Sequence, residues 1–239
     1  MDLKGKTFII TGVRRIGKVV AKSLAEKGAN LAIVDLMKED VDAAVLECSG
    51  ANVKVLGYPV DLSNSNDLNP LIDKIVQDFG GVDGLIHMVA NYPKTPIGNI
   101  TLEDFDKTMH IISASSLLLG QKVGGVMDSG KMIFFSDWSV LRSPYPDYIV
   151  YNAAKTSVES IAKSLAKHFA PKIAVNVIAP GPILRPPDLS DAENKEVMDK
   201  TPLQKWGGEE EIVKAILYLL DSDFVTGITL AVDGGRSIA

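Results

Sequence analysis

The first thirty-five residues constrain the fold most, because a short apolar strand, a turn and an amphipathic helix follow one another there. Thr7–Ile10 is an apolar run of the kind buried in a parallel sheet, and Thr11-Gly12 interrupts it. Apolar residues then recur at helical spacing, at Ile16, Val19, Val20 and Leu24. Gly28 is placed to end the helix, and 31–34 forms a second strand that closes on Asp35. The pattern predicts a βαβ unit.

The turn of this unit has the features of a phosphate-binding site. A helix that begins at a glycine turn offers free backbone N–H groups and the positive end of its dipole, which bind a pyrophosphate. An acidic residue at the tip of the second strand is placed to hold the hydroxyls of an adenosine ribose. The unit therefore predicts a dinucleotide site, with the candidate residues Thr11, Gly12, Arg14, Arg15, Ile16, Gly17 and Asp35.

The rest of the chain continues this alternation. Strands are predicted at 53–60, 85–89, 131–135 and 173–178, and helical patterns at 68–79, 102–123 and 152–169. We therefore predict an α/β fold, a Rossmann-type doubly wound parallel sheet with helices on both faces. No linker, repeat or composition shift points to a second domain, so residues 1–239 are expected to form a single domain.

Composition excludes several classes of function. The formal net charge is −5 and no basic stripe is present, which argues against a nucleic-acid partner. No apolar run is long enough to span a bilayer and no signal-peptide pattern is present, so we expect a cytoplasmic protein without membrane contact. The single Cys48 is expected to pack against Val41 and Val45. No cluster of His, Cys, Asp and Glu has metal-ligand spacing, so no metal site is predicted.

Tyr151 and Lys155 stand four positions apart at the head of the predicted helix 152–169. On a helix this spacing puts the phenol and the ammonium on one face, where the positive charge favours the ionised phenol. Such a pair can donate and accept a proton. Tyr151 and Lys155 are therefore candidate catalytic residues, and the alternative is a half-buried tyrosine beside a solvated lysine.

With these residues in view, the chain resembles the short-chain dehydrogenase/reductase family over essentially its whole length. The matching motifs follow the family's order: Thr11–Gly17, Asp35, Val60-Asp61-Leu62, Tyr151/Lys155, Asn176–Gly181 and Val225–Gly235. The resemblance implies an oxidoreductase that transfers a hydride between nicotinamide and a small carbonyl or alcohol substrate, with Tyr151 as general acid and base. It implies further cofactor contacts at Tyr151, Lys155, Asp61, Leu62, Val89, Ala90, Pro180, Gly181 and Ile183.

The glycine turn departs from the family pattern. It is one residue shorter than usual, and Arg15 before Ile16-Gly17 resembles the pteridine-reductase-like branch, where that arginine contributes to phosphate binding. Asp35 would repel a 2′-phosphate and favours NAD(H), whereas Arg14 and Arg15 would neutralise the phosphate and favour NADP(H). We expect NAD, with NADP as the alternative, because Asp35 bears directly on the ribose.

The family's catalytic serine has no direct counterpart either. Its usual spacing from Tyr151 falls on Trp138, so Asp137 is predicted to take its position, with one extra residue in the loop at 143–146. An aspartate there again resembles the pteridine reductases, and it must be protonated to donate a hydrogen bond to a substrate oxygen. Ser136 is the rival candidate, and either residue could instead cap the loop.

Two further family positions are altered. Ile112 stands where the family has an asparagine in the long helix, and an isoleucine cannot bind the water that links the lysine to solvent. The segment His87–Ala90 replaces Asn-Asn-Ala-Gly, and His87 is expected to be structural. These changes support an alternative of another class, a dinucleotide-binding sensor or subunit without efficient catalysis. The intact Tyr151 and Lys155 favour the enzyme.

Substrate and assembly are less constrained. Residues 184–205, with few periodic apolar positions, are predicted to form a mobile lid over a small-molecule substrate. A general carbonyl or alcohol substrate is the first choice, and a pteridine or a 3-oxoacyl thioester is the second. Tyr92, Trp138 or Tyr145 could offer an aromatic face to a pteridine. The resemblance also implies a homo-oligomer, a tetramer or a dimer, formed through the long helices and the last strand.

Overall fold

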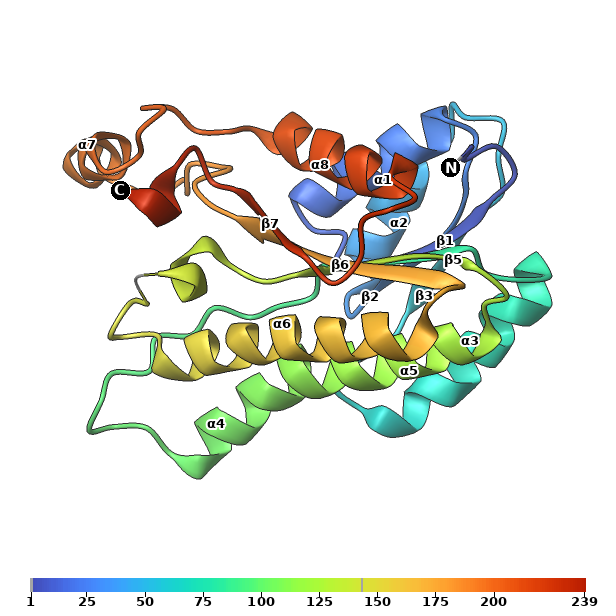
Figure 1. Ribbon diagram of the computed structural model, residues 1–239, viewed down its shortest axis with the longest axis horizontal. Coiled ribbons are helices and arrows are strands. Elements are labelled where there is room, and N and C mark those ends of the chain that lie inside the picture. Colours follow the sequence, from blue (N-terminus) through green and yellow to red (C-terminus); the bar gives the residue numbers. More distant parts are fainter. Residues whose placement is uncertain (1, 143) are drawn as a thin grey trace.

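The computed structural model describes residues 2–142 and 144–239, and their strands form one parallel sheet in the order β3-β2-β1-β4-β5-β6-β7 (Figure 1). The strands are β1 (Thr7–Thr11), β2 (Asn30–Asp35), β3 (Val55–Pro59), β4 (Gly84–His87), β5 (Gly130–Phe135), β6 (Ile173–Pro180) and β7 (Thr229–Val232). The predicted doubly wound parallel sheet is confirmed.

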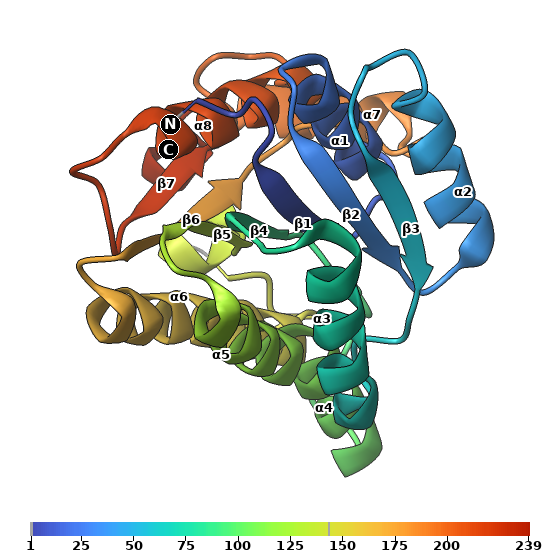
Figure 2. The ribbon, with the colours of Figure 1, turned by 90° about the vertical axis from the view of Figure 1, so that its right-hand side faces the viewer.

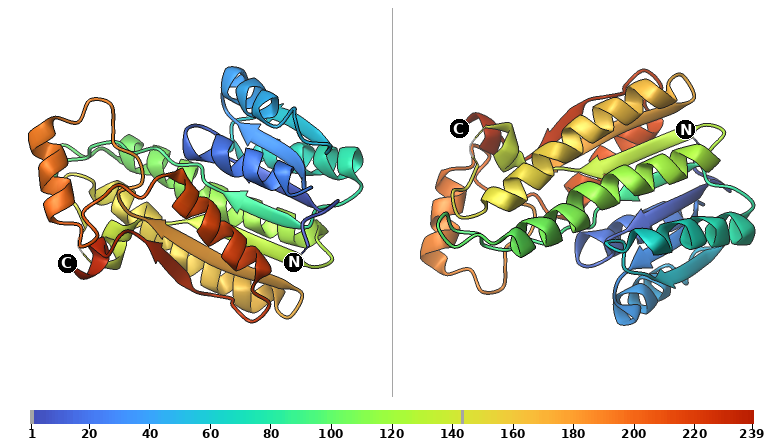
Figure 3. Two further views of the ribbon diagram at one scale, coloured as in Figure 1. Left: turned by 90° about the horizontal axis from the view of Figure 1, so that it is seen from above. Right: turned by 90° about the horizontal axis from the view of Figure 1, so that it is seen from below.

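Helices cover both faces of the sheet, as the end-on view in Figure 2 shows. They are α1 (Ile16–Glu26), α2 (Lys38–Glu47), α3 (Ser65–Phe79), α4 (Leu102–Met109), α5 (Ser115–Val126), α6 (Ile149–Phe169), α7 (Asp191–Asp199) and α8 (Glu209–Asp221). Short helical segments are η1 (His110–Ala114), η2 (Trp138–Leu141) and η3 (Arg236–Ile238). Helices α1, α2 and α8 lie on one face, and α3, α5 and α6 on the other (Figures 2 and 3).

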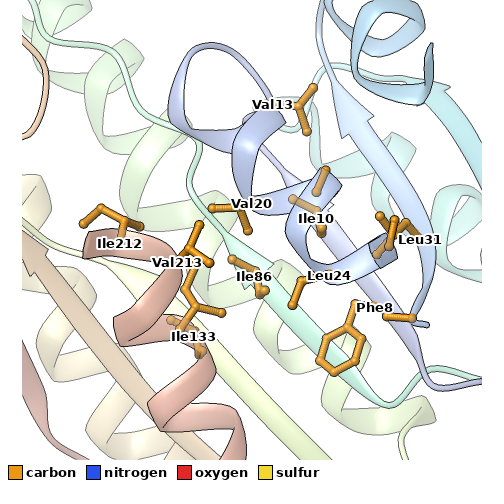
Figure 4. Packing of buried hydrophobic residues seen from close by; sticks show 14 of the residues in the cluster. Phe8, Ile10, Val13, Val20, Leu24, Leu31, Ile86, Ile133, Ile212 and Val213 are labelled. Atoms are coloured by element: carbon orange, nitrogen blue, oxygen red, sulfur yellow. The ribbon is translucent and has the colours of Figure 1, made fainter. Parts of the chain in front are cut away.

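Alternate side chains of each strand point into two hydrophobic cores, one on each face of the sheet. Phe8 and Ile10 of β1 point into the core under α1 and α8, in the same cluster as Leu24 and Ile212 (Figure 4). Ile9, between them, points to the opposite core under α3, α5 and α6. Each such fully buried side chain contributes about 1.5–3 kcal/mol relative to an exposed one. Burial on both faces explains why the strands are continuous apolar runs.

The direction of winding reverses between β1 and β4, which are neighbours in the sheet. The chain proceeds from β1 to β2 and β3 on one side, and from β4 to β5, β6 and β7 on the other. Connecting segments diverge at such a point and leave a crevice at the carboxyl ends of the strands. Gly12, Asp35 and Asp137 all follow strands at this edge.

Three segments differ from the sequence-based expectation. The predicted helix 102–123 is interrupted by a π-helical turn at 110–114, where Ser116 Oγ donates to the backbone carbonyl of Ile112 at 2.6 Å. Strand β4 ends at His87. The predicted lid at 184–205 contains α7, whose amino terminus has a Ser190/Glu193 capping box. Among the helices described, none is both long and apolar enough to cross a membrane.

Cys48 packs in the core beside Val41, Ala44 and Val45, as its predicted position on the apolar face of α2 requires. Burial raises the pKa of its thiol to about 11. A thiol held in its protonated form is a poor nucleophile. Cys48 therefore serves the core.

Candidate active site

The turn between β1 and α1 packs closely against the backbone that follows β4. Gly12 has a φ of 78°, and a Cβ there would lie 2.8 Å from the carbonyl carbon of Met88. A Cβ on Gly17 would lie 2.2 Å from the Gly12 carbonyl oxygen. Only glycine fits at these two positions. The amino terminus of α1 is thereby held directly above the end of β4, where a pyrophosphate can approach its N–H groups.

Arg15 carries the conformational cost of the shortened turn. Its φ is 46° and its ψ is −106°, although it is not a glycine. Left-handed backbone at a bulky residue is strained by about 1–3 kcal/mol and is found mainly at functional sites. The turn closes with a hydrogen bond of 3.0 Å from Gly17 N–H to the Arg14 carbonyl. The turn therefore closes although it is one residue shorter than usual, and the backbone of Arg15 is strained as a result.

Asp35 fixes the turn to the second strand. Its Oδ2 accepts a hydrogen bond of 2.8 Å from Val13 N–H, and its Oδ1 accepts one of 2.8 Å from Leu36 N–H. Arg14 donates from Nε to Asp40 Oδ2 at 2.6 Å. The hydrogen bond to Asp40, with its negative charge, raises the pKa of Arg14 above its ordinary value. The two predicted cofactor selectors thus have different protein partners.

A cavity of about 320 Å³ opens beside Asp35. Its lining includes predicted cofactor residues from three loops, namely Gly12, Arg14, Asp35, Asp61, Leu62, Val89 and Ala90. Asp61 accepts bonds from Ser63 N–H at 2.9 Å and Ser63 Oγ at 2.7 Å, so it shapes its own loop. Asn91 also lines the cavity, and its buried Oδ1 has no partner in the described part of the chain. A buried amide oxygen of this kind can accept a hydrogen bond from a polar ligand. The polar residues that line this cavity fit the adenosine end of the predicted dinucleotide, for which the sequence assigns Asp35 to the ribose.

A second cavity, of about 470 Å³, shares Gly12, Arg14 and Met88 with the first. It contains the remaining predicted cofactor residues of the strand ends, Arg15, Ile16, Gly17, Pro180, Gly181 and Ile183. Thr11 lines neither cavity. The two cavities adjoin at these shared residues and together reach from Asp35 to Asp137. The residues present therefore fit the cofactor that the sequence predicts.

Asp137 lines the second cavity and contacts Tyr151, whereas the predicted cofactor residues Tyr151 and Lys155 are buried and line neither cavity. The Tyr151 hydroxyl donates to Asp137 Oδ2 at 2.9 Å, and Asp137 Oδ1 accepts from Ser139 N–H at 2.8 Å. The ring of Tyr92, which lines the cavity, lies edge-on to Tyr151, with centroids 4.6 Å apart. Burial, and then the negative charge of Asp137, raise the pKa of Tyr151 well above its ordinary value.

Lys155 lies beneath Tyr151 and is fully enclosed. Its Nζ donates to the Phe135 carbonyl at 2.7 Å and lies 5.9 Å from the centre of the Tyr151 ring. Burial lowers the pKa of Lys155 to about 8, although the charge of Asp137 acts in the opposite direction. The sequence predicted that Lys155 would favour an ionised Tyr151. In this arrangement burial and Asp137 have the larger effect and keep the phenol protonated.

Comparison with known proteins agrees with this geometry. A family model described as "Enoyl-(Acyl carrier protein) reductase" matches residues 12–237. A glucose 1-dehydrogenase of Gluconobacter oxydans is 33% identical, over 98% of this chain and 92% of its own length. A 3-oxoacyl-[acyl-carrier-protein] reductase of Thermotoga maritima is 29% identical over the full length of both chains. The chain belongs to the short-chain dehydrogenase/reductase family. The predicted membership is confirmed.

Solved structures extend the likeness to three dimensions. A blue fluorescent protein from a metagenomic library, crystallised in complex with NADPH, superposes with a TM-score of 0.92. It is 26% identical and covers 99% of this chain and 100% of its own. As a short-chain dehydrogenase/reductase, the protein is an NAD(P)-dependent oxidoreductase, which confirms the predicted enzyme class and the predicted type of cofactor.

Asp137, which the sequence predicts at the position of the family's usual serine, is the carboxylate that lies against the Tyr151 hydroxyl. Ser136, the rival candidate, points the other way, because its Oγ donates to Glu159 Oε1 at 2.9 Å and lies 3.3 Å from the Lys155 carbonyl. Ser136 is buried and does not contact Tyr151. Its prediction as a catalytic residue is therefore not supported by the geometry. Ser143, in the loop expected to contain the extra residue, lies outside the described residues.

His87 joins three elements of this short-chain dehydrogenase/reductase. Its Nδ1 lies 2.7 Å from Thr11 Oγ1 on β1, and its Nε2 lies 3.1 Å from Ser115 Oγ on α5. Burial lowers the pKa of His87 to about 3, and the charge of Lys155 acts in the same direction. A neutral imidazole with both nitrogens engaged has a structural role, as expected from the sequence. Thr11 is therefore directed toward His87 and away from the cofactor cavities.

Ile112 is buried at the centre of the π-helical turn, so no polar side chain stands at the usual asparagine position. Ser113, its neighbour, has its hydroxyl 2.6 Å from that of Ser157 on α6.

Sequence reasoning missed two residues of the second cavity, Trp206 and Arg236. Neither belongs to a motif, although an arginine so near a run of glycines, in Gly234-Gly235-Arg236, was a possible signal.

Proposed function

We propose that this protein is an NAD(H)-dependent oxidoreductase that interconverts a small carbonyl compound and its alcohol, with Tyr151 as the proton donor and acceptor. The observation that carries the proposal is the hydrogen bond of 2.9 Å from the Tyr151 hydroxyl to Asp137, above the buried Lys155 and beside a cavity of about 470 Å³. A tyrosine with a charged lysine beneath it and space for a ligand beside it can act in acid–base catalysis.

The chain's own residues supply binding and proton transfer. Gly12 and Gly17 leave room for a pyrophosphate at the amino terminus of α1, and Asp35 can accept hydrogen bonds from ribose hydroxyls with its remaining lone pairs. A bound nicotinamide supplies or accepts the hydride. In the reductive direction Tyr151 gives its proton to the substrate oxygen, and the positive charge of Lys155 stabilises the tyrosinate that remains.

Asp137 takes the place of a serine at this site. In the structure it accepts the Tyr151 hydrogen bond, so it holds the phenol in one orientation. A substrate oxygen that binds next to Tyr151 replaces this carboxylate as the acceptor of the phenolic proton. Asp137 then remains available to accept a hydrogen bond from a substrate O–H or N–H group.

The partners of Arg14 favour NAD(H) over NADP(H). Arg14 is paired with Asp40, which offsets the charge that a 2′-phosphate would require. Asp35 keeps a carboxylate at the ribose end of the first cavity, where it repels a phosphate. Titration of the purified protein with NADH and NADPH tests the choice. Tighter binding of NADPH contradicts the choice of NAD(H), and binding of neither contradicts the proposed function.

Reduction of a 3-oxoacyl thioester is the second candidate, because the Thermotoga maritima reductase matches this chain over the full length of both. A panel of aldehydes, ketones and 3-oxoacyl thioesters, assayed with the preferred nicotinamide and with Tyr151→Phe as the control, separates the candidates. Turnover of small carbonyl compounds that is absent in Tyr151→Phe supports the first proposal. Turnover restricted to thioesters supports the second.

The predicted homo-oligomer and cytoplasmic location are also proposals. Exposed apolar side chains on α4, α5 and α6 and near β7 support assembly, among them Phe105, Leu117, Ile149, Phe224 and Ile228. Light scattering of the purified protein measures the oligomeric state, and a monomer at micromolar concentration contradicts this proposal.

A further inference from the structure

Arg236 is a buried cation at the wall of the second cavity. It begins η3 and is only 9% exposed. Its Nη1 donates to the Val197 carbonyl at 3.0 Å, and its Cζ lies 5.0 Å from the centre of the Trp138 ring. The Nε and Nη2 groups, which form one edge of the guanidinium, have no partner among the residues described. This edge has the shape that binds a carboxylate through two parallel hydrogen bonds.

The carboxylates nearest to Arg236 are engaged elsewhere. Asp233 accepts from Gly235 N–H at 2.9 Å and from Ser237 N–H at 2.7 Å. Asp137 accepts from Tyr151 and Ser139. Glu196 is exposed and pairs with Lys200, which lowers the pKa of Glu196, and the charge of Arg236 adds to this effect. The Nε and Nη2 edge of Arg236 therefore has no carboxylate in hydrogen-bond contact among the residues described, and a ligand carboxylate in the cavity would supply one.

Aromatic rings connect Arg236 with Tyr151. Trp138, stacked under the guanidinium, lies edge-on to Tyr145 at 5.7 Å, and Tyr145 lies 6.1 Å from Tyr148. Tyr148 stacks on Tyr92 at 4.1 Å, and Tyr92 meets Tyr151 at 4.6 Å. Trp138 also follows Asp137 directly in the chain. A series of ring contacts therefore links Tyr151 with Arg236, and three of these rings, Tyr92, Trp138 and Tyr145, line the second cavity.

We propose that the substrate of this enzyme is an aromatic or similarly planar carbonyl compound that carries a carboxylate. Arg236 binds the carboxylate through Nε and Nη2, the rings of Trp138 and Tyr92 contact the planar body, and the carbonyl oxygen lies at Tyr151. This inference rests on the proposed function, because it places the reacting carbonyl beside Tyr151. It adds a specificity residue and a class of substrate to that proposal.

Thermal stability measured with a matched ligand pair tests the binding of the anion. The probes are 4-(hydroxymethyl)benzoate and its neutral amide, 4-(hydroxymethyl)benzamide, each with and without NAD⁺. We expect the benzoate to raise the melting temperature of the wild type more than the amide does. The difference should vanish in Arg236→Gln, return in part in Arg236→Lys, and persist in Lys74→Gln, which removes an exposed, paired cation of α3 that lines neither cavity.

Steady-state kinetics provide the second readout. The wild type should reduce 4-formylbenzoate with a kcat/KM at least about tenfold higher than that for 4-formylbenzamide, because a desolvated charge pair forms only with the acid. Arg236→Gln should lose this preference through a higher KM for the acid, with little change for the amide. Equal values for both compounds in the wild type overturn the inference, as does an equal loss for both in the variant.

The two readouts keep this inference distinct from the proposed function. If the wild type binds the benzoate in preference to the amide but reduces neither aldehyde with any nicotinamide, the anion site stands and the proposed function fails. If it reduces the neutral aldehyde and shows no preference for the acid, the function stands and the anion site fails. Binding of neither probe overturns the anion site as well. Should Arg236→Gln not fold, the ligand comparison in the wild type alone decides.

Discussion

The Tyr151 hydroxyl and Asp137 Oδ2 lie 2.9 Å apart, so the proton of the candidate acid is held by a carboxylate in place of the serine hydroxyl usual in the family. Tyr151→Phe should lower kcat by at least about 100-fold, because general acid catalysis of this kind contributes 10²–10⁴-fold. Cofactor affinity should stay within a factor of about two to three. Single-turnover kinetics and NADH titration of the same preparation measure both, and unchanged turnover would falsify the assigned role.

Replacement of Asp137 should affect the orientation of the Tyr151 hydroxyl more than its ability to donate a proton. Asp137→Asn keeps the shape and removes the negative charge that helps to raise the pKa of Tyr151. We expect a kcat about tenfold lower, because an acceptor of Tyr151 and of substrate groups is weakened. Ser136→Ala is the matched control, since Ser136 bonds to Glu159, and its kcat should stay within about twofold of the wild type. A larger loss in Ser136→Ala than in Asp137→Asn would reverse the assignment.

Activity should fall as the pH rises above about 8. Burial lowers the pKa of Lys155 to about 8, so its ammonium loses the proton above that pH and no longer stabilises a tyrosinate. The profile of kcat/KM against pH, which reports the free enzyme, should show this limb. In Lys155→Arg the charge persists, so the limb should move to higher pH even if the rate is reduced. A limb at the same pH in that variant would assign it to another group.

Release of Arg14 from Asp40 should shift the choice of cofactor toward NADP(H). Asp40→Asn removes the partner that offsets the Arg14 charge and leaves Asp35 and the glycine turn untouched. We expect the ratio of the NADPH and NADH dissociation constants to change by about tenfold in favour of NADPH. Asp42→Asn on the same helix, which pairs with Lys38, is the control and should leave the ratio unchanged. An unaltered ratio in Asp40→Asn would place the 2′-phosphate away from Arg14.

His87 should make the fold sensitive to acid. Its pKa is about 3 in the folded protein and 6.5 in an ordinary environment, so the unfolded chain binds the proton first. The stability due to neutral His87 is complete above pH 6.5 and is lost as the pH falls from 6.5 toward 3. His87→Asn should flatten the decline of the unfolding free energy over this range, as measured by urea titration. An identical slope in both proteins would show that other groups dominate.

Arg15 should be replaceable by glycine with a gain in stability. At a φ of 46°, glycine relieves strain that costs a bulky residue about 1–3 kcal/mol. Part of this gain is lost because glycine is more flexible in the unfolded state. Chemical denaturation should show a net gain of about 0.5–1 kcal/mol for Arg15→Gly relative to Arg15→Ala, the matched loss of charge. A less stable Arg15→Gly would mean that the turn does not hold this strain.

The fold could be predicted from the sequence because the apolar runs and the glycine turns match the strands and turns of the parallel sheet. The apolar runs around Ile10 and Ile33 are buried on both faces, and Gly12 and Asp35 mark the ends of their strands. What the sequence missed depends on contacts across long separations. The hydroxyl direction of Ser136 is set by Glu159, and the approach of Arg236 to Trp138 joins the two sides of the cavity. No spacing rule encodes either contact.

The candidate site lies at the carboxyl ends of the strands. The turns at the opposite edge of the sheet can accept inserted residues. Gly80, between α3 and β4, has a φ of 81° and open space around its Cα, and Gly81 beside it is equally unhindered. Neither lines a cavity described above. A peptide inserted between them would extend into solvent at the edge remote from Tyr151. The molecule therefore offers a position for an affinity tag, a reporter or a fused domain that leaves the chemistry of the other edge intact.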